Sequence, residues 1–170
     1  MFSRYVVSGL MLTYLILQVP LAGFSADSSQ AEQISHERTV LVDSYANEKL
    51  WYWQGRLNLD NWKVSLAVVH SGELRPNTLG NIRWDLENKT ATIRVLDPAD
   101  YSLQFPELLA DIEVTVVHEL IHLKRDLVLN RYSESEANRR KEEYAVNHET
   151  ETLLQKDRER TASAPSRSRL

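Results

Sequence analysis

The chain is short of the residues that make covalent cross-links and sharp turns. It has no cysteine, and only five glycines and five prolines among its 170 residues. Without cysteine it has no disulfide, no thiolate ligand for a metal and no attachment site for the lipid of a lipoprotein. Any metal site would therefore depend on nitrogen and oxygen ligands.

The chain also lacks a large excess of positive or negative residues. The 20 Lys and Arg residues against 24 Asp and Glu leave a net charge of −4, and the pI is about 5.7. No basic stripe interleaved with aromatic residues runs through the middle of the chain, which argues against a nucleic-acid partner. With 42% hydrophobic and 26% charged residues, the composition predicts one globular domain, residues 27–157, between two appendages.

The one long apolar segment lies at the N-terminus. Residues 6–18 are mostly apolar, follow the positively charged Arg4, and precede helix-breaking and small residues at 20–26. This layout predicts a signal peptide over residues 1–26 and a secreted or periplasmic protein. An uncleaved membrane anchor is the alternative. Three cleavage positions fit the layout: after Gly23, Ser25 or Ala26.

The opposite end, residues 158–170, has almost no apolar side chains and carries four arginines. A segment of this composition buries too little surface to offset the entropy lost on ordering. The sequence therefore predicts a disordered tail.

The sequence His118-Glu119-Leu120-Ile121-His122 lies inside an apolar run. On a helix, the two histidines lie one turn apart on the same face, so both imidazoles can reach one metal ion. Glu119 lies beside them, where it can act as a general base on a water at the metal. The pattern predicts a Zn2+ site that hydrolyses peptide bonds. The alternative is a pair of core histidines, but a glutamate buried between them is costly without a nearby cation.

A zinc site of this kind needs a third protein ligand. Carboxylates follow His122 after about twenty residues, at Glu142 and Glu143, which leaves room for a second helix to turn back. Glu143 falls near the helical stripe that contains Val146, so we expect it, rather than Glu142, to face the metal. Asn147, one turn later, is expected to hydrogen-bond a ligand histidine.

The two motifs together resemble a known group of enzymes. His-Glu-x-x-His at 118–122, followed by Glu-Glu-x-x-Val-Asn at 142–147, resembles the gluzincin branch of the zinc metallopeptidases, above all its compact single-domain members from bacteria and phages. The resemblance covers residues 51–155. It implies a zincin-like fold in which His118, His122 and Glu143 bind zinc and Glu119 is the general base. Many gluzincins also stabilise the oxyanion with a Tyr or His, and three candidates exist here: Tyr132, Tyr144 and His148.

The spacing of hydrophobic residues predicts an α+β fold. Strands are expected at 62–69, 82–86 and 91–96, the last two as an antiparallel hairpin. The helix with the metal motif is expected near 106–128, and the helix with Glu143 near 133–155. An N-terminal helix is expected from Ser28 to Trp53, because five apolar residues recur there at roughly helical spacing with charges between them: Ile34, Val40, Leu41, Tyr45 and Leu50.

The strand just before the metal helix, residues 91–96, is expected at the edge of the sheet. Its backbone at Ala91, Ile93 and Val95 would then pair with an extended peptide lying antiparallel to it across the zinc. The loops 71–81 and 123–132 are expected to complete the substrate pocket. The predicted partner is therefore a peptide or protein substrate.

Two other functions fit the same sequence. A zincin-like module could bind a partner without cleaving it, although the intact Glu119 argues against this. An exported structural domain could instead hold the histidines in its core without metal.

Overall fold

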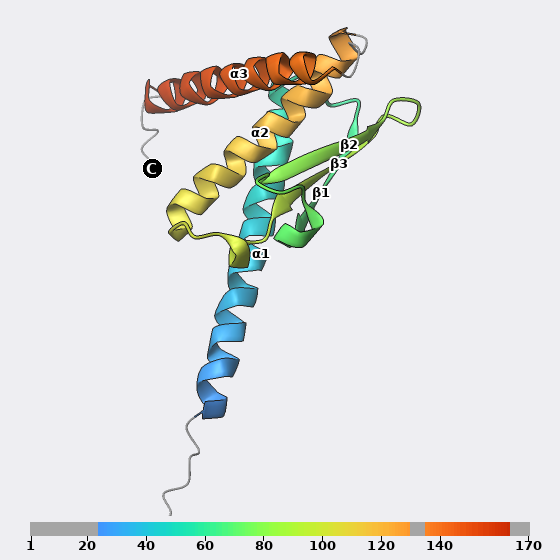
Figure 1. The fold of residues 1–170 in the computed structure, drawn as a ribbon. Helices are drawn as coiled ribbons and strands as arrows, with labels where there is room; N and C mark the ends of the chain where they lie inside the picture. The colour runs from blue at the N-terminus through green and yellow to red at the C-terminus, as the bar shows by residue number, and fades with distance from the viewer. Residues whose placement is uncertain (1–23, 130–134, 164–170) are drawn as a thin grey trace, which may run out of the picture.

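The computed structural model describes residues 24–129 and 135–163, which form three α-helices and one three-stranded sheet (Figure 1). In chain order the elements are α1 (Phe24–Arg56), β1 (Lys63–Val69), β2 (Gly80–Asp85), β3 (Thr90–Leu96), α2 (Phe105–Leu129) and α3 (Glu136–Ser163). Two short 3-10 helices, η1 (Ser71–Glu73) and η2 (Pro98–Asp100), lie in the connections. The expected α+β class and the order of one helix, three strands and two helices are confirmed.

The strands lie in the order β1-β3-β2. β2 and β3 form the predicted antiparallel hairpin, with Ile82 opposite Ile93. β1 pairs with the other side of β3 and runs parallel to it. The prediction that Ala91, Ile93 and Val95 form an exposed edge is therefore wrong. β3 is the central strand, these three side chains are buried, and the edge strands of the sheet are β1 and β2.

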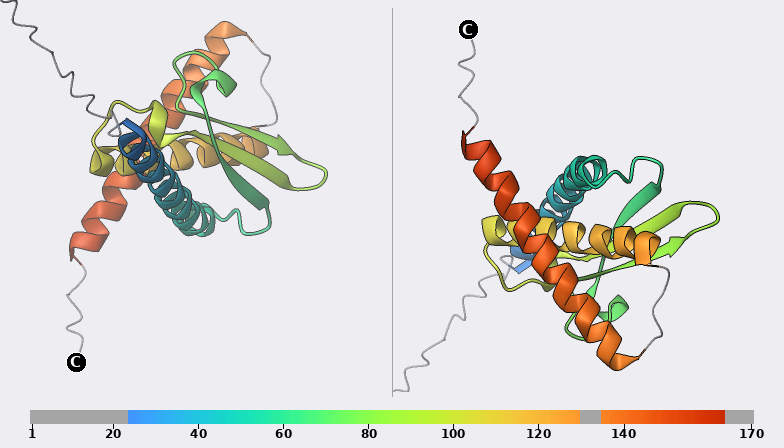
Figure 2. Two further views of the ribbon diagram at one scale, coloured as in Figure 1. Left: turned by 90° about the horizontal axis from the view of Figure 1, so that it is seen from below. Right: turned by 90° about the horizontal axis from the view of Figure 1, so that it is seen from above.

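Helix α2 lies at the centre of the molecule. It packs against α1, against the sheet and against α3, which lies across it (Figures 1 and 2). Because apolar side chains occur around most of its circumference, it can be buried from several sides at once. Its fully buried residues are Leu108, Ile112, Val116, Val117, Leu120, Ile121 and Leu123.

Only the C-terminal half of α1 belongs to the core. The buried stripe is Val42, Ala46, Leu50 and Trp53, at the spacing of one helix face. The N-terminal half extends away from the other elements (Figure 1). Three of the apolar residues whose spacing predicted this helix, Ile34, Val40 and Leu41, are exposed, each by about half.

The C-terminal helix is longer than expected. It packs through Val146, Thr150 and Leu154 and continues to Ser163, so the prediction of disorder is wrong for residues 158–163. Polar contacts hold this end. Asp157 accepts a hydrogen bond from the Tyr52 hydroxyl and forms ion pairs with Arg56 and Arg160, which ties α3 to α1. The rest of the predicted tail, 164–170, lies outside the described residues.

The prediction at the N-terminus also falls mostly outside the described residues. The last three residues of the expected signal peptide, 24–26, are the first residues of α1. Within the described ranges, no helix is both long enough and apolar enough to cross a membrane.

A polar network joins α1 to α2 at Glu113. Its carboxylate accepts hydrogen bonds from the Trp53 indole (2.9 Å) and the Tyr45 hydroxyl (3.2 Å), and it pairs with the Lys49 ammonium (3.0 Å). Trp53 is fully buried, so its N–H has no access to water once this acceptor is removed.

We expect Glu113→Ala to lower the free energy of unfolding by about 2 kcal/mol, because it leaves a buried donor without a partner. Urea unfolding followed by tryptophan fluorescence measures this. Glu48→Ala, at an exposed position of α1, is the control and should change stability by less than about 0.5 kcal/mol. Equal stabilities of the two variants would contradict a structural role for the network.

Candidate metal centre

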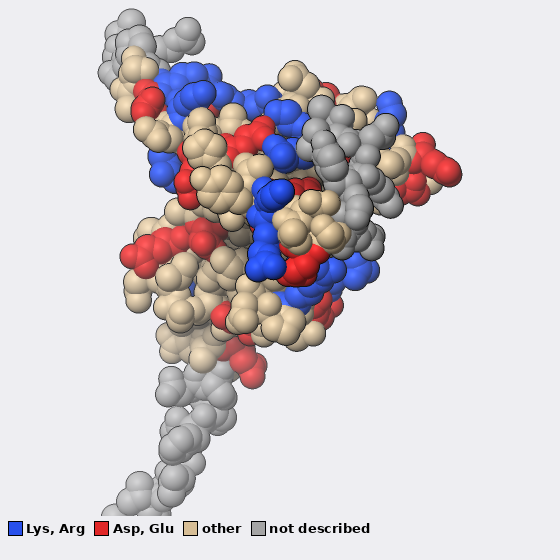
Figure 3. Space-filling model, turned by 45° about the horizontal axis from the view of Figure 1, so that its top comes forward, with Lys and Arg blue, Asp and Glu red and all other residues tan. Residues whose placement is uncertain are grey.

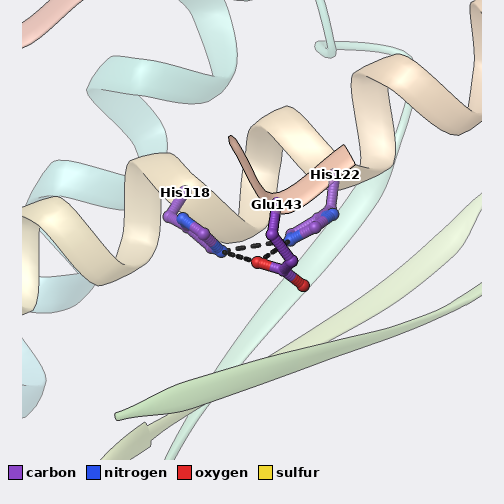
Figure 4. A group of neighbouring side chains, drawn as sticks. All are labelled: His118, His122 and Glu143. Atoms are coloured by element: carbon purple, nitrogen blue, oxygen red, sulfur yellow. Dashed lines mark hydrogen bonds and ion pairs between the residues drawn. The ribbon is translucent and has the colours of Figure 1, made fainter. Parts of the chain in front are cut away.

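Two histidines from α2 and one carboxylate from α3 meet at a single point (Figure 4). The Nε2 atoms of His118 and His122 lie 3.0 Å apart. Glu143 Oε2 lies 3.6 Å from His118 Nε2 and 3.7 Å from His122 Nε2. The one-turn spacing on α2 and the core-facing stripe of α3 thus bring together the three residues that the sequence singled out.

The donor distances suit a small tetrahedral cation. Two ligands that each lie about 2.0–2.1 Å from a zinc ion are about 3.3 Å apart. The three distances here, 3.0, 3.6 and 3.7 Å, bracket that value. Two imidazole nitrogens and one carboxylate oxygen are also the ligand types that zinc accepts in sites with an open fourth position.

Other residues of α3 hold the two imidazole rings. Glu142, the alternative ligand, lies with Oε1 3.4 Å from Nδ1 of His122 and so contacts the far side of that ring. A carboxylate in this place favours the tautomer with its proton on Nδ1, which directs the Nε2 lone pair to the centre. Asn147, the predicted partner of a ligand histidine, also lines the cleft, and its side chain raises the pKa of His118.

Burial sets the electrostatics of this group. The pKa of His118 is lowered by burial and by the neighbouring His122, partly offset by Glu143 and Asn147, so the neutral ring is favoured. Burial, with a smaller contribution from the charge of Glu143, raises the pKa of Glu119 to about 8. Glu119 is only 7% exposed. A nearby cation would relieve the cost of keeping both carboxylates charged.

The three residues open into a cleft of about 710 Å³. Its walls are strand β2, the loop that precedes β2, one face of α2 and the N-terminal part of α3. Glu119 lines the same cleft. On the face shown in Figure 3, acidic and basic side chains are interspersed.

Strand β2 begins directly against the side of α2 that carries Glu119. A Cβ atom at Gly80 would lie 2.5 Å from Thr115 Cγ2, 2.8 Å from the Arg94 carbonyl oxygen and 3.6 Å from Glu119 Oε1. Only glycine permits this approach. The absent side chain therefore places the free edge of β2 beside the candidate metal centre.

The β2–β3 register shows which backbone groups of that edge are free. The Leu96 amide donates to the Leu79 carbonyl, so odd-numbered positions of β2 bond to β3. The N–H and C=O groups of Gly80, Ile82 and Trp84 therefore point away from β3. They are available to an additional strand.

Comparisons with protein-family models, with curated protein sequences and with solved structures give no match to this chain. Its function has therefore to be argued from the residues in the cleft.

Two of the three residues considered for oxyanion stabilisation, Tyr144 and His148, are not among those that line the cleft. Tyr144 is 77% exposed and His148 is exposed, and Tyr132 lies outside the described residues. Sequence reasoning missed Asp111 and Thr115, which lie on α2 at one-turn intervals before Glu119 and also line the cleft. Their spacing was a usable signal, because positions 111, 115 and 119 share one helix face.

We expect Glu143→Ala to weaken zinc binding by at least about 100-fold, because it removes one of the three side chains that could hold the ion. Glu142→Ala should weaken it by about tenfold, because it removes only the partner of His122. Competition with a chromogenic chelator measures both affinities. Glu151→Ala, exposed on the same helix, is the control and should not change them. A larger loss in Glu142→Ala than in Glu143→Ala would show that Glu142 is the ligand.

Proposed function

We propose that this protein is a zinc-dependent peptidase, with His118, His122 and Glu143 as the zinc ligands. One observation carries the proposal: two histidines of α2 and one carboxylate of α3 converge at the wall of an open cleft. They lie beside a buried glutamate. The resemblance of these residues to the gluzincin pattern supports it. Because a signal peptide is predicted, we also propose that the protein acts outside the cytoplasm.

A zinc ion bound here would polarise a substrate carbonyl and lower the pKa of a water molecule. Glu119 supplies the proton transfers that peptide hydrolysis needs. As general base it accepts a proton from the attacking water, and as general acid it returns a proton to the leaving amine. Its position next to His118 on α2, facing the cleft, supports this role.

We propose that the substrate pairs with the free edge of β2, and not with the β3 positions expected from the sequence. An extended peptide that adds to this edge would bond to the backbone of Gly80, Ile82 and Trp84. Antiparallel pairing is the more stable mode. The β2 edge borders the cleft, so a peptide bound to it would pass the candidate metal centre.

We expect Glu119→Gln to keep its zinc and to lose at least about 100-fold in cleavage of an unstructured protein, because the general base is gone. Gel electrophoresis with and without a chelator follows cleavage, and atomic emission measures zinc. Glu107→Gln, exposed on the same helix, is the control with unchanged activity. Full activity in Glu119→Gln would overturn the role of Glu119.

The same measurements separate the other functions. A wild-type protein that binds zinc but cleaves nothing would be a binding module. A wild-type protein that binds no zinc would be a structural domain with core histidines. Either result would overturn the proposed activity.

Pairing with β2 can be tested on the substrate instead of the protein. In a peptide that is cleaved, methylating a nitrogen that faces β2 removes a hydrogen bond, and we expect kcat/KM to fall about tenfold. Methylating the next nitrogen, which faces away, should have little effect. A series of singly methylated peptides should therefore alternate between slow and fast cleavage. If the cleavage rates in this series did not alternate, the proposal that the substrate pairs with β2 would be wrong.

A further inference from the structure

One acidic side chain in the cleft has no part in the proposed metal site. Asp111 lies seven residues before His118, so both side chains lie on nearly the same side of α2. Along the helix the two positions are about 10 Å apart. Asp111 lines the cleft together with Val114 and Thr115.

A hydrogen bond holds this carboxylate in place. The Tyr101 hydroxyl donates to Asp111 Oδ2 at 2.9 Å. Burial and the charge of Asp111 hold the pKa of Tyr101 well above its usual range, which keeps the hydroxyl a donor. Arg75 and Arg83 also line the cleft, but neither is paired with Asp111 among the ion pairs of the described residues. Its charge is therefore available to a ligand.

The direction of β2 tells which part of a bound peptide would reach Asp111. Gly80, at the start of β2, lies against Thr115, and Trp84, near its end, donates to Asp126 at 2.8 Å. β2 and α2 therefore run in the same direction. A peptide antiparallel to β2 runs the opposite way, with its C-terminal part towards Asp111. A distance of about 10 Å corresponds to about three residues of extended chain.

We propose that Asp111 selects substrates with a lysine or arginine two or three residues after the cleaved bond. This inference rests on the proposed peptidase function and on antiparallel binding to β2. A carboxylate at this place attracts a cationic side chain and repels a free C-terminal carboxylate. The site therefore favours cleavage within a chain over removal of its last few residues.

The test uses pairs of peptides that differ only by Lys or Gln at one position, scanned over three residues on each side of the cleaved bond. Binding to zinc-loaded Glu119→Gln and cleavage by the wild type are both measured. We expect about a tenfold preference for Lys on the C-terminal side, the lower end of the range for a hydrogen bond to a charged group. Adding Asp111→Asn should abolish this preference, since the amide still accepts from Tyr101 but carries no charge. Glu107→Gln should retain it.

Each outcome has one meaning. An equal Lys preference with and without Asp111→Asn would overturn the role of Asp111, as would a preference confined to the N-terminal side. If the wild type cleaves no peptide with zinc, the peptidase function fails. Binding of the same peptides to zinc-loaded Glu119→Gln would still show whether Asp111 distinguishes Lys from Gln.

Discussion

The packing of α2 against every other large element is the constraint on which this structure depends. Its fully buried residues, among them Leu108, Ile112 and Leu120, close the core between α1, the sheet and α3. Apart from Glu113, whose partners lie on α1, the polar side chains in the middle of this helix lie on the side that opens on the cleft. Asp111, Glu119 and the two histidines all occur there because polar groups are stable on α2 only where water or a partner can reach them.

The position of Glu143, the third residue of the candidate metal centre, depends on how α3 lies across α2. Val146, Thr150 and Leu154 fix its register from the inside, and the contacts of Asp157 with α1 fix its far end. A shift of one helical turn is about 5.4 Å, more than the distance between Glu143 and either histidine. A cation that binds all three side chains would therefore also stabilise the packing of α3.

Features set by local spacing could be predicted from the sequence, and features set by distant contacts could not. The β2–β3 hairpin and the placement of Glu143 on the Val146 stripe depend on neighbouring residues only. The central position of β3 depends on where β1 pairs, and a half-buried edge strand has the same alternation as a central one. In α1 the spacing of apolar residues predicted the helix but not which of them are buried, because Ile34 and Leu41 lie where no other described element covers the helix. The helix at 158–163 was missed because Tyr52 and Arg56, which hold it, lie about 100 residues away.

The correction of the sheet order changes the chemistry as well as the topology. A central β3 buries Ile93 and Val95 and cannot accept another strand, whereas β2 leaves alternate backbone groups free. An open edge of this kind invites association with other chains. The free edge of β2 lies inside the cleft, with α2 and α3 on one side of it and the loop before β2 at its start. The β2 edge therefore suits a single extended chain. The candidate metal centre, Glu119 and Asp111 then lie along the path of that chain, and α2 sets the spacing of Asp111, His118 and Glu119.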